Sequence, residues 1–115
     1  MMKYIIPAIP PSLNKFAGRR NVHEYRKLKQ EWTMLVKLCC RKTPDKPLGR
    51  ATVTIKYFFP DRRRRDPDNF SGKLLMDGLT AAGVIKDDSF DCINLVLKGG
   101  YDKQNPRTEI EVTPC

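Results

Sequence analysis

A nine-residue segment of strict alternation limits what this chain can fold into. Every second residue from 51 to 59 is apolar, and these residues are Ala51, Val53, Ile55, Tyr57 and Phe59. A period of two places such side chains on one side of an extended backbone, which predicts a strand with one buried face. Pro60 and Asp61 end the pattern. A chain with this strand must build a sheet and cover one face of it.

Three shorter segments supply neighbours for that strand. Residues 2–6 read as a strand that ends at Pro7, and residues 93–98 and 108–112 also alternate. Glycine and proline between the last two break the chain there. The pattern predicts that 93–98 and 108–112 form an antiparallel hairpin with a long loop.

Two helices are expected to cover the sheet. Apolar residues recur at three- and four-residue steps over 24–41, and a second helix is predicted over 71–82, with Gly83 as its C-terminal cap. With 115 residues, 40% of them apolar, the chain is expected to be a single domain, 1–115. The predicted fold class is α+β, a mixed sheet with two main helices on one side.

The charge balance indicates a polyanionic partner. Lys and Arg number 22 against 13 Asp and Glu, which gives a formal charge of +9 and a pI near 9.6. Such an excess on a small domain favours nucleic acid. The loop from 14 to 21 carries three cations suited to a phosphate backbone, although a solvated loop explains them equally well: Lys15, Arg19 and Arg20.

Several other classes of protein are disfavoured. The N-terminus lacks the apolar region of a signal peptide and no apolar run is long enough for a membrane span, so a cytoplasmic location is expected. No C-x-x-C pair begins a zinc site among the four cysteines, which are expected to stay reduced. His23 is the only histidine and cannot build a multi-histidine metal site.

The segment from Arg62 to Asn69 sets four arginines directly against two aspartates. Guanidinium groups attract phosphate, whereas paired carboxylates repel it unless a hard cation lies between them. Pro67 is expected to hold the backbone extended, so that Asp66 and Asp68 point to the same side. Mg²⁺ would relieve their mutual repulsion. The same alternation places Arg63 and Arg65 on one face toward DNA, and leaves Arg62 and Arg64 as solvated or partner-facing charges.

A third acid would hold such a metal firmly, and spacing alone leaves four candidates open: Asp77, Asp87, Asp88 and Asp91. Asp77 lies four residues after Lys73, so those two also fit a plain ion pair on a helix.

Two structural explanations compete with a metal site. Asp68 or Asn69 could cap the second helix while Asp66 forms a turn. A calcium loop is excluded, because Phe70 occupies a ligand position and Ser71 stands where the sharp turn needs glycine.

The ordered set of motifs resembles the RusA family of Holliday junction resolvases, crossover junction endodeoxyribonucleases. The matching elements are Ile9-Pro10-Pro11-Ser12-Leu13-Asn14, Arg62 to Asn69, Lys73, Asp77-Gly78-Leu79 and Gly83 to Asp88. The spacing from Asp68 to Lys73 departs from the family's pattern by one extra residue at the start of the helix. The resemblance covers nearly the whole chain.

The resemblance implies an α+β homodimer that uses Mg²⁺ or Mn²⁺ to resolve four-way junctions by paired symmetric nicks, in DNA recombination and repair. It assigns Asp66, Asp68 and Asp88 to metal binding and catalysis, Lys73 to catalysis and Arg65 to the DNA backbone. Arg62, Arg63 and Arg64 are expected to assist in DNA binding. Two alternatives stay open: a non-catalytic nucleic-acid-binding module, and a nuclease that also cuts other branched DNA, such as flaps and forks, or RNA.

Overall fold

The sheet that the alternating segment predicts is present, with that segment inside it. The computed structural model describes residues 1–12 and 22–115. Its strands, in spatial order, are β1 (Met2–Ile6), β4 (Arg107–Pro114), β2 (Ala51–Phe59) and β3 (Ile93–Tyr101). β4 runs antiparallel to both β1 and β2, whereas β3 runs parallel to β2. The mixed sheet confirms the predicted α+β class.

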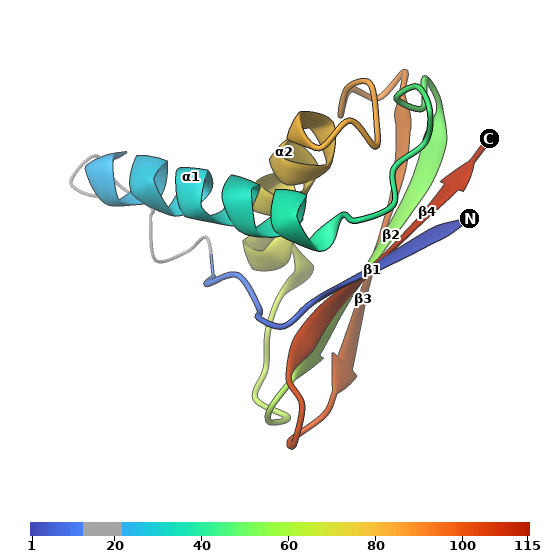
Figure 1. Ribbon diagram of the computed structural model, residues 1–115. Coiled ribbons are helices and arrows are strands. Elements are labelled where there is room, and N and C mark those ends of the chain that lie inside the picture. The colour runs from blue at the N-terminus through green and yellow to red at the C-terminus, as the bar shows by residue number, and fades with distance from the viewer. Residues whose placement is uncertain (13–21) are drawn as a thin grey trace.

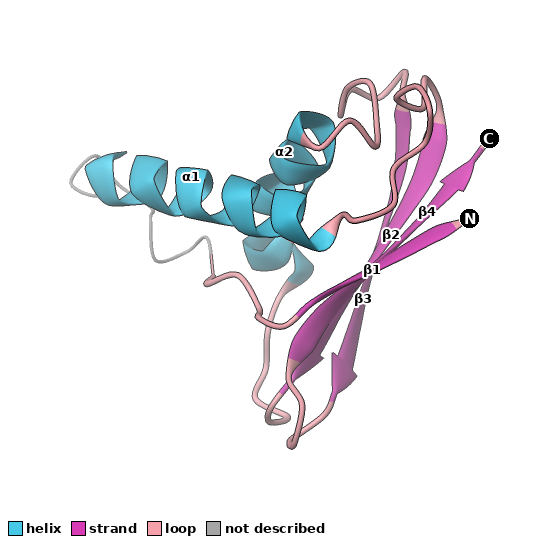
Figure 2. Cartoon of the chain, viewed as in Figure 1, coloured by secondary structure: helices cyan, strands magenta, loops and turns pink. Residues whose placement is uncertain are grey.

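Both helices cover the same face of this sheet. Figure 1 and Figure 2 show α1 (Val22–Cys39) and α2 (Lys73–Ala81) on one side of the strands. The predicted helices 24–41 and 71–82 are confirmed, with ends displaced by one or two residues, as is usual for helix termini. The core between the layers is fully buried at Ile6, Val36, Ile55, Leu75, Leu79 and Ile110.

The predicted hairpin between 93–98 and 108–112 is wrong. β3 and β4 do not pair with each other, because β2 lies between them and bonds to both along most of its length. The chain from β3 to β4 passes over the end of β2, where the Asp102 amide donates to the Phe59 carbonyl at 2.8 Å. β2 is the most buried strand, and its backbone groups need partners on both edges. The alternating pattern of two strands joined by a loop is compatible with this arrangement, in which a third strand lies between them, as well as with a hairpin.

Two glycines with left-handed backbones bound α2. Gly83 has φ of 81°, and the amides of Gly83 and Val84 donate to the carbonyls of Thr80 and Leu79. This is the Schellman ending of a helix, and it confirms the predicted cap. Gly72, with φ of 84°, precedes the helix, and a Cβ there would lie 2.7 Å from Cδ1 of Ile55. Gly72 therefore lets the start of α2 press against the sheet.

Two further features concern the helices and the cysteines. In the described ranges no helix has the length and apolar character that crossing a membrane requires. All four cysteines are free thiols: Cys39, Cys40, Cys92 and Cys115. Burial raises the pKa of Cys40 to about 11, so this thiol stays protonated at neutral pH.

Candidate active site beside strand β3

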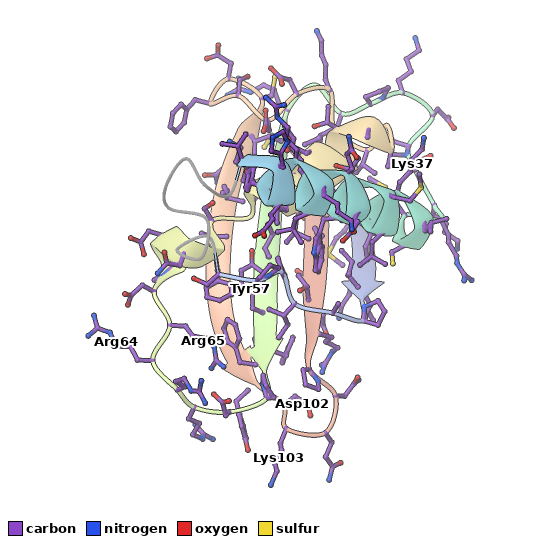
Figure 3. The ribbon with its side chains drawn as sticks, turned by 90° about the vertical axis from the view of Figure 1, so that its left-hand side faces the viewer. Lys37, Tyr57, Arg64, Arg65, Asp102 and Lys103 are labelled. Carbon is purple, nitrogen blue, oxygen red and sulfur yellow. The ribbon has the colours of Figure 1, made fainter. Side chains whose placement is uncertain are left out.

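The charged segment occupies the connection from the end of β2 to the start of α2. Figure 3 shows Arg64 directed away from the protein and Arg65 turned back toward the sheet. The Arg64 side chain is 89% exposed, whereas that of Arg65 is 20% exposed. Neighbouring arginines of one run therefore have different surroundings.

Arg65 is bound inside the protein by three kinds of contact. Its Nη1 lies 2.9 Å from Oδ1 of Asp61 and donates to the Asp61 carbonyl at 3.1 Å. Its guanidinium group lies 4.3 Å from the centre of the Phe59 ring. The hydrogen bond from Arg65, followed by that from the Arg63 amide, lowers the pKa of Asp61. These contacts fix the backbone immediately before Asp66.

The expectation that Arg63 and Arg65 share one DNA-facing side is therefore not met. Arg65 contacts both the Asp61 carboxylate and the Phe59 ring, and these two contacts hold it against the sheet. Arg62, Arg63 and Arg64 are exposed, and Arg62 also stacks over the ring of Tyr101 at 4.6 Å. These three arginines form the outward cationic surface of the segment.

The two aspartates after the arginines do not lie on one extended strand. Asp66 is extended, with φ of −101° and ψ of 138°, but Pro67 begins a single 3₁₀ turn, η3 (Pro67–Phe70), that contains Asp68. Proline suits the first position of a helical turn because its fixed φ is already helical. Both aspartates are exposed, and Oδ1 of Asp66 lies 3.3 Å from Nε of Arg64.

Helix capping does not explain these acids. The residue before α2 is Gly72, and no side chain caps this helix. Asp66 makes no side-chain capping bond to the 3₁₀ turn either. The capping role considered for Asp68 and Asn69 is therefore excluded at α2, and both aspartates keep carboxylates at the surface.

Lys73 and Asp88 line the same hollow although they are fifteen positions apart in the chain. They line one hollow of about 420 Å³, together with Ser71, Met76, Ser89, Phe90, Ile93 and Leu95. Lys73 is the first residue of α2, and its Nζ lies 5.9 Å from the centre of the Tyr25 ring. Asp88 follows a segment that is fixed by backbone bonds between Leu48 and residues 84 and 86.

The structure gives different surroundings to the four aspartates that sequence spacing left as candidates for the third acid. Oδ2 of Asp77 lies 3.5 Å from Nζ of Lys29, so Asp77 pairs with α1 instead of with Lys73. Asp87 accepts a hydrogen bond from the Asp88 amide at 2.9 Å, and Asp91 is exposed beyond the turn. Of the four, Asp88 shares the hollow with Lys73.

Asp66 and Asp88 nevertheless border different parts of β3. Asp66 lines a second hollow with Leu97 and Gly99, whereas Asp88 lies beside Ile93 and Leu95. Four residues of strand correspond to roughly 13 Å. Accordingly, residues 1–12 and 22–115 contain no group of three acidic, histidine or cysteine side chains arranged to hold a metal. The carboxylates are the donor type that Mg²⁺ prefers, but they are not gathered into a three-acid site.

Some predicted site residues lie outside the residues that the structure describes, and some residues of the site were not predicted from the sequence. The predicted phosphate contacts Lys15, Arg19 and Arg20 lie outside the described residues. Asp61 was not predicted to contribute, although its spacing of four from Arg65 is a detectable signal. Tyr57 was assigned to the core, and no local pattern distinguishes it from the other apolar residues of its strand.

A small basic domain with exposed arginines, carboxylates and a lysine along one edge of its sheet has the composition of a nuclease site. The family model described as Endodeoxyribonuclease RusA matches residues 8–113. The chain belongs to the RusA family and is an endodeoxyribonuclease. It is similar to the Crossover junction endodeoxyribonuclease rusA of Enterobacteria phage HK97, with 33% identity over 115 residues that cover 96% of this chain and 92% of that protein.

Proposed function

We propose that this endodeoxyribonuclease resolves Holliday junctions by paired symmetric nicks. The observation that carries the proposal is the contact of 3.3 Å between Arg64 and Asp66 on an exposed segment. The arginine would attract a DNA phosphate to this segment, and a metal ion held by the neighbouring carboxylate would offset the repulsion between the carboxylate and the phosphate. The family membership of the chain and the name of its phage relative support a crossover junction as the substrate.

The outward arginines would bind the DNA backbone. Arg62, Arg63 and Arg64 are exposed, and their charges attract phosphate without regard to sequence. Arg65 would act differently, as a positioning residue, because its contacts to Asp61 and Phe59 already occupy it. Lys15, Arg19 and Arg20 remain proposed phosphate contacts on the strength of their charge.

Lys73 would stabilise charge during cleavage. Lys73 is exposed and lines the same hollow as Asp88, which is also bordered by Ser71 and Ser89. A compact point charge of this kind stabilises a developing oxyanion or a leaving oxygen. The proposal thus keeps Asp66, Asp68, Asp88 and Lys73 as the catalytic residues.

The reaction is proposed to depend on Mg²⁺, with Mn²⁺ as a substitute. Asp66, Asp68 and Asp88 are the proposed ligands because carboxylate oxygens suit the ion. Within the described residues they are not gathered into one group, so a shared site would require Asp88 to approach the other two. When bound, such a metal provides a Lewis acid and an activated water.

A homodimer is proposed from the symmetry of the substrate. A four-way junction has two-fold symmetry, and two copies related by a two-fold axis would present one site to each of two opposing strands. Paired nicks would follow from that arrangement. The oligomeric state is testable by analytical ultracentrifugation with and without a junction.

Cleavage of a labelled four-way junction by the purified protein tests the proposal. Reactions contain Mg²⁺ or EDTA, and linear duplex of the same sequence and the Asp68→Asn variant run beside them. The expected result is symmetric nicks in the junction alone, dependent on both the metal and Asp68. The variant should bind the junction as tightly as the wild type or more tightly, because it lacks a charge that repels phosphate.

Two outcomes would replace the proposal by its alternatives. Binding of the junction without cleavage under any divalent metal would indicate a non-catalytic nucleic-acid-binding module. Equal cutting of duplex, flaps, forks or RNA would indicate a nuclease with a broader substrate range.

A further inference from the structure

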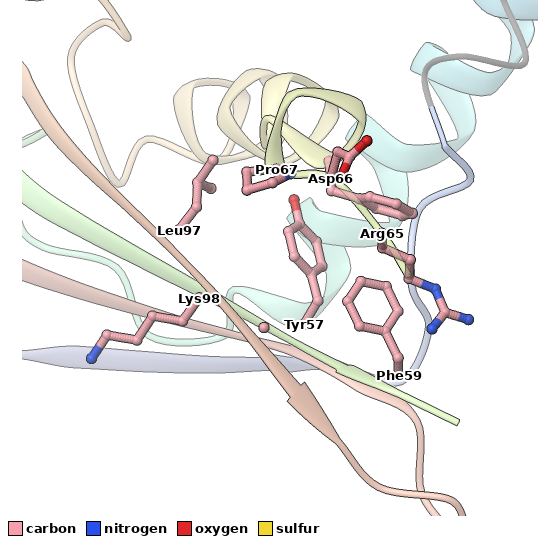
Figure 4. Close-up of a pocket in the computed structure, with 9 residues that line it drawn as sticks. Tyr57, Phe59, Arg65, Asp66, Pro67, Leu97 and Lys98 are labelled. Atoms are coloured by element: carbon pink, nitrogen blue, oxygen red, sulfur yellow. The ribbon is translucent and has the colours of Figure 1, made fainter. Parts of the chain in front are cut away.

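The hollow beside Asp66 has an aromatic floor. We name it the aromatic hollow; it has a volume of about 140 Å³ and is bordered by Tyr57, Phe59, Phe70, Asp66, Leu97 and Gly99. The centres of the three rings lie between 5.1 and 5.9 Å apart. Figure 4 shows Tyr57 and Phe59 rising from the sheet beneath Asp66 and Pro67.

One polar atom in this hollow has no hydrogen-bond partner among residues 1–12 and 22–115. Tyr57 is 3% exposed, and its hydroxyl makes no hydrogen bond within the described residues. Burial raises the pKa of Tyr57, so the hydroxyl stays protonated and keeps its hydrogen-bond donor. Buried hydroxyls nearly always have partners, and one without a partner calls for a ligand or a specific role.

The walls of the hollow leave room for a flat molecule. A Cβ at Gly99 would meet no atom within 4 Å, so this side is open. Figure 4 shows the side chain of Lys98 leading away from Tyr57, so its ammonium group does not fill the space. The hollow therefore offers aromatic surface and an edge formed by Asp66, and the Tyr57 hydroxyl lies buried within its lining.

We propose that the aromatic hollow binds one unstacked nucleobase of the DNA, next to the phosphate that is cut. This inference rests on the proposed function and deepens it. A base stacks on aromatic rings whatever its identity, and a buried hydroxyl can distinguish bases by the hydrogen bond that it makes to their edges. The neighbouring arginines 62–64 attract the adjoining phosphates. The hollow thereby couples the choice of cut site to the identity of one nucleotide.

A photochemical crosslink tests occupancy without any need for cutting. Four-way junctions carry 5-iodouracil at single positions on either side of the crossover, and are irradiated with the protein in EDTA. The crosslinked peptide is identified by mass spectrometry. A crosslink to Tyr57, Phe59 or Phe70 from one position, and not from all, is expected. Crosslinks that avoid all three residues at every position would overturn the inference.

The Tyr57→Phe variant tests whether the hydroxyl reads the base. Cutting rates are compared across junctions that differ in the nucleotides at the cut site, with Tyr101→Phe as the control. Loss of one hydrogen bond should reduce the ratio of cutting rates between the best and the poorest junction by roughly three- to tenfold. The control should keep the wild-type ratio. An unchanged ratio in Tyr57→Phe, with an unchanged melting temperature, would overturn base reading by Tyr57.

The two measurements separate this inference from the proposed function. If the wild-type protein cuts no junction but gives the crosslink, the aromatic hollow binds a base and junction resolution fails. If it cuts junctions symmetrically and crosslinks only elsewhere, resolution stands and the base-binding inference fails.

Discussion

Nη1 of Arg65 lies 2.9 Å from Oδ1 of Asp61, and this pair ties the residue before Asp66 to the end of β2. Through this contact Arg65 helps to position Asp66, the residue that follows it. A functional site commonly depends on such positioning contacts as much as on the groups that touch the substrate.

Replacement of Asp61 by asparagine should slow cleavage without weakening binding. The neutral side chain loses the charge that holds Arg65, so Asp66 is placed less accurately, and a rate loss of roughly 10- to 100-fold is expected. Single-turnover rates and junction affinities measure the two effects separately. Asp45→Asn, an exposed aspartate in another turn, is the control. Wild-type rates for Asp61→Asn would show that Arg65 does not position the site.

The same pair predicts a pH dependence of stability. The pKa of Asp61 is lowered in the folded protein, so its contribution is complete above the ordinary value of 3.8 and is lost as the pH falls through the lowered value. The difference in unfolding free energy between wild type and Asp61→Asn should therefore be constant at neutral pH and disappear in acid. Urea titrations over that range measure it. A difference that persists at the lowest pH would contradict the ionic pair.

Removal of Arg64 should weaken binding to every DNA in a salt-dependent way. Its side chain is 89% exposed, and a phosphate contact contributes about one unit to the slope of log affinity against log salt. Arg64→Ala should lower that slope, while Arg50→Ala should leave it unchanged. Arg50 is also exposed, but it precedes β2 at the opposite end of that strand. Equal slopes for the two variants would argue against the arginine segment as the DNA contact.

Replacement of Lys73 by glutamine should impair the chemical step more than binding. Loss of one charge that stabilises a transition state costs roughly 100- to 1000-fold in rate. Lys86→Gln is the matched control, because Lys86 is an exposed lysine just beyond α2. Rates measured at saturating protein separate chemistry from affinity. If both variants cut alike, the catalytic role of Lys73 is wrong.

Gly78→Ala should destabilise the fold by closing the contact between the helices. A Cβ at Gly78 would lie 2.4 Å from Cβ of Val36, which is fully buried in α1. Overpacking of this kind costs about 1–3 kcal/mol, which opposes a gain in helix propensity of about 1 kcal/mol. Gly49→Ala, with no atom within 4 Å of its Cβ, is the control. Thermal unfolding of the two variants measures the difference.

Local patterns predicted the elements well and their pairing less well. The bounds of β1 and β2 agree with the alternation, and the cap at Gly83 follows from its place after a helical stripe. The hairpin failed because alternation specifies which face of a strand is buried, and does not specify which strand lies beside it. The extended geometry expected at Asp68 failed because proline also suits the first turn of a helix.

The central strand, the two helices and the chemical character of the segment from Arg62 to Asp68 were predictable from the amino-acid sequence, because they depend on residue type and short-range spacing. Three features became evident only from the folded chain: β2 separates β3 from β4, Asp88 lines the same hollow as Lys73, and Arg65 turns inward to Asp61. In the same packing, the Tyr57 hydroxyl has no hydrogen-bond partner within the described part of the chain, and Tyr57 lines one hollow with Asp66. These outcomes depend on which distant segments pack together, and that choice minimises the free energy of the whole chain instead of any one segment.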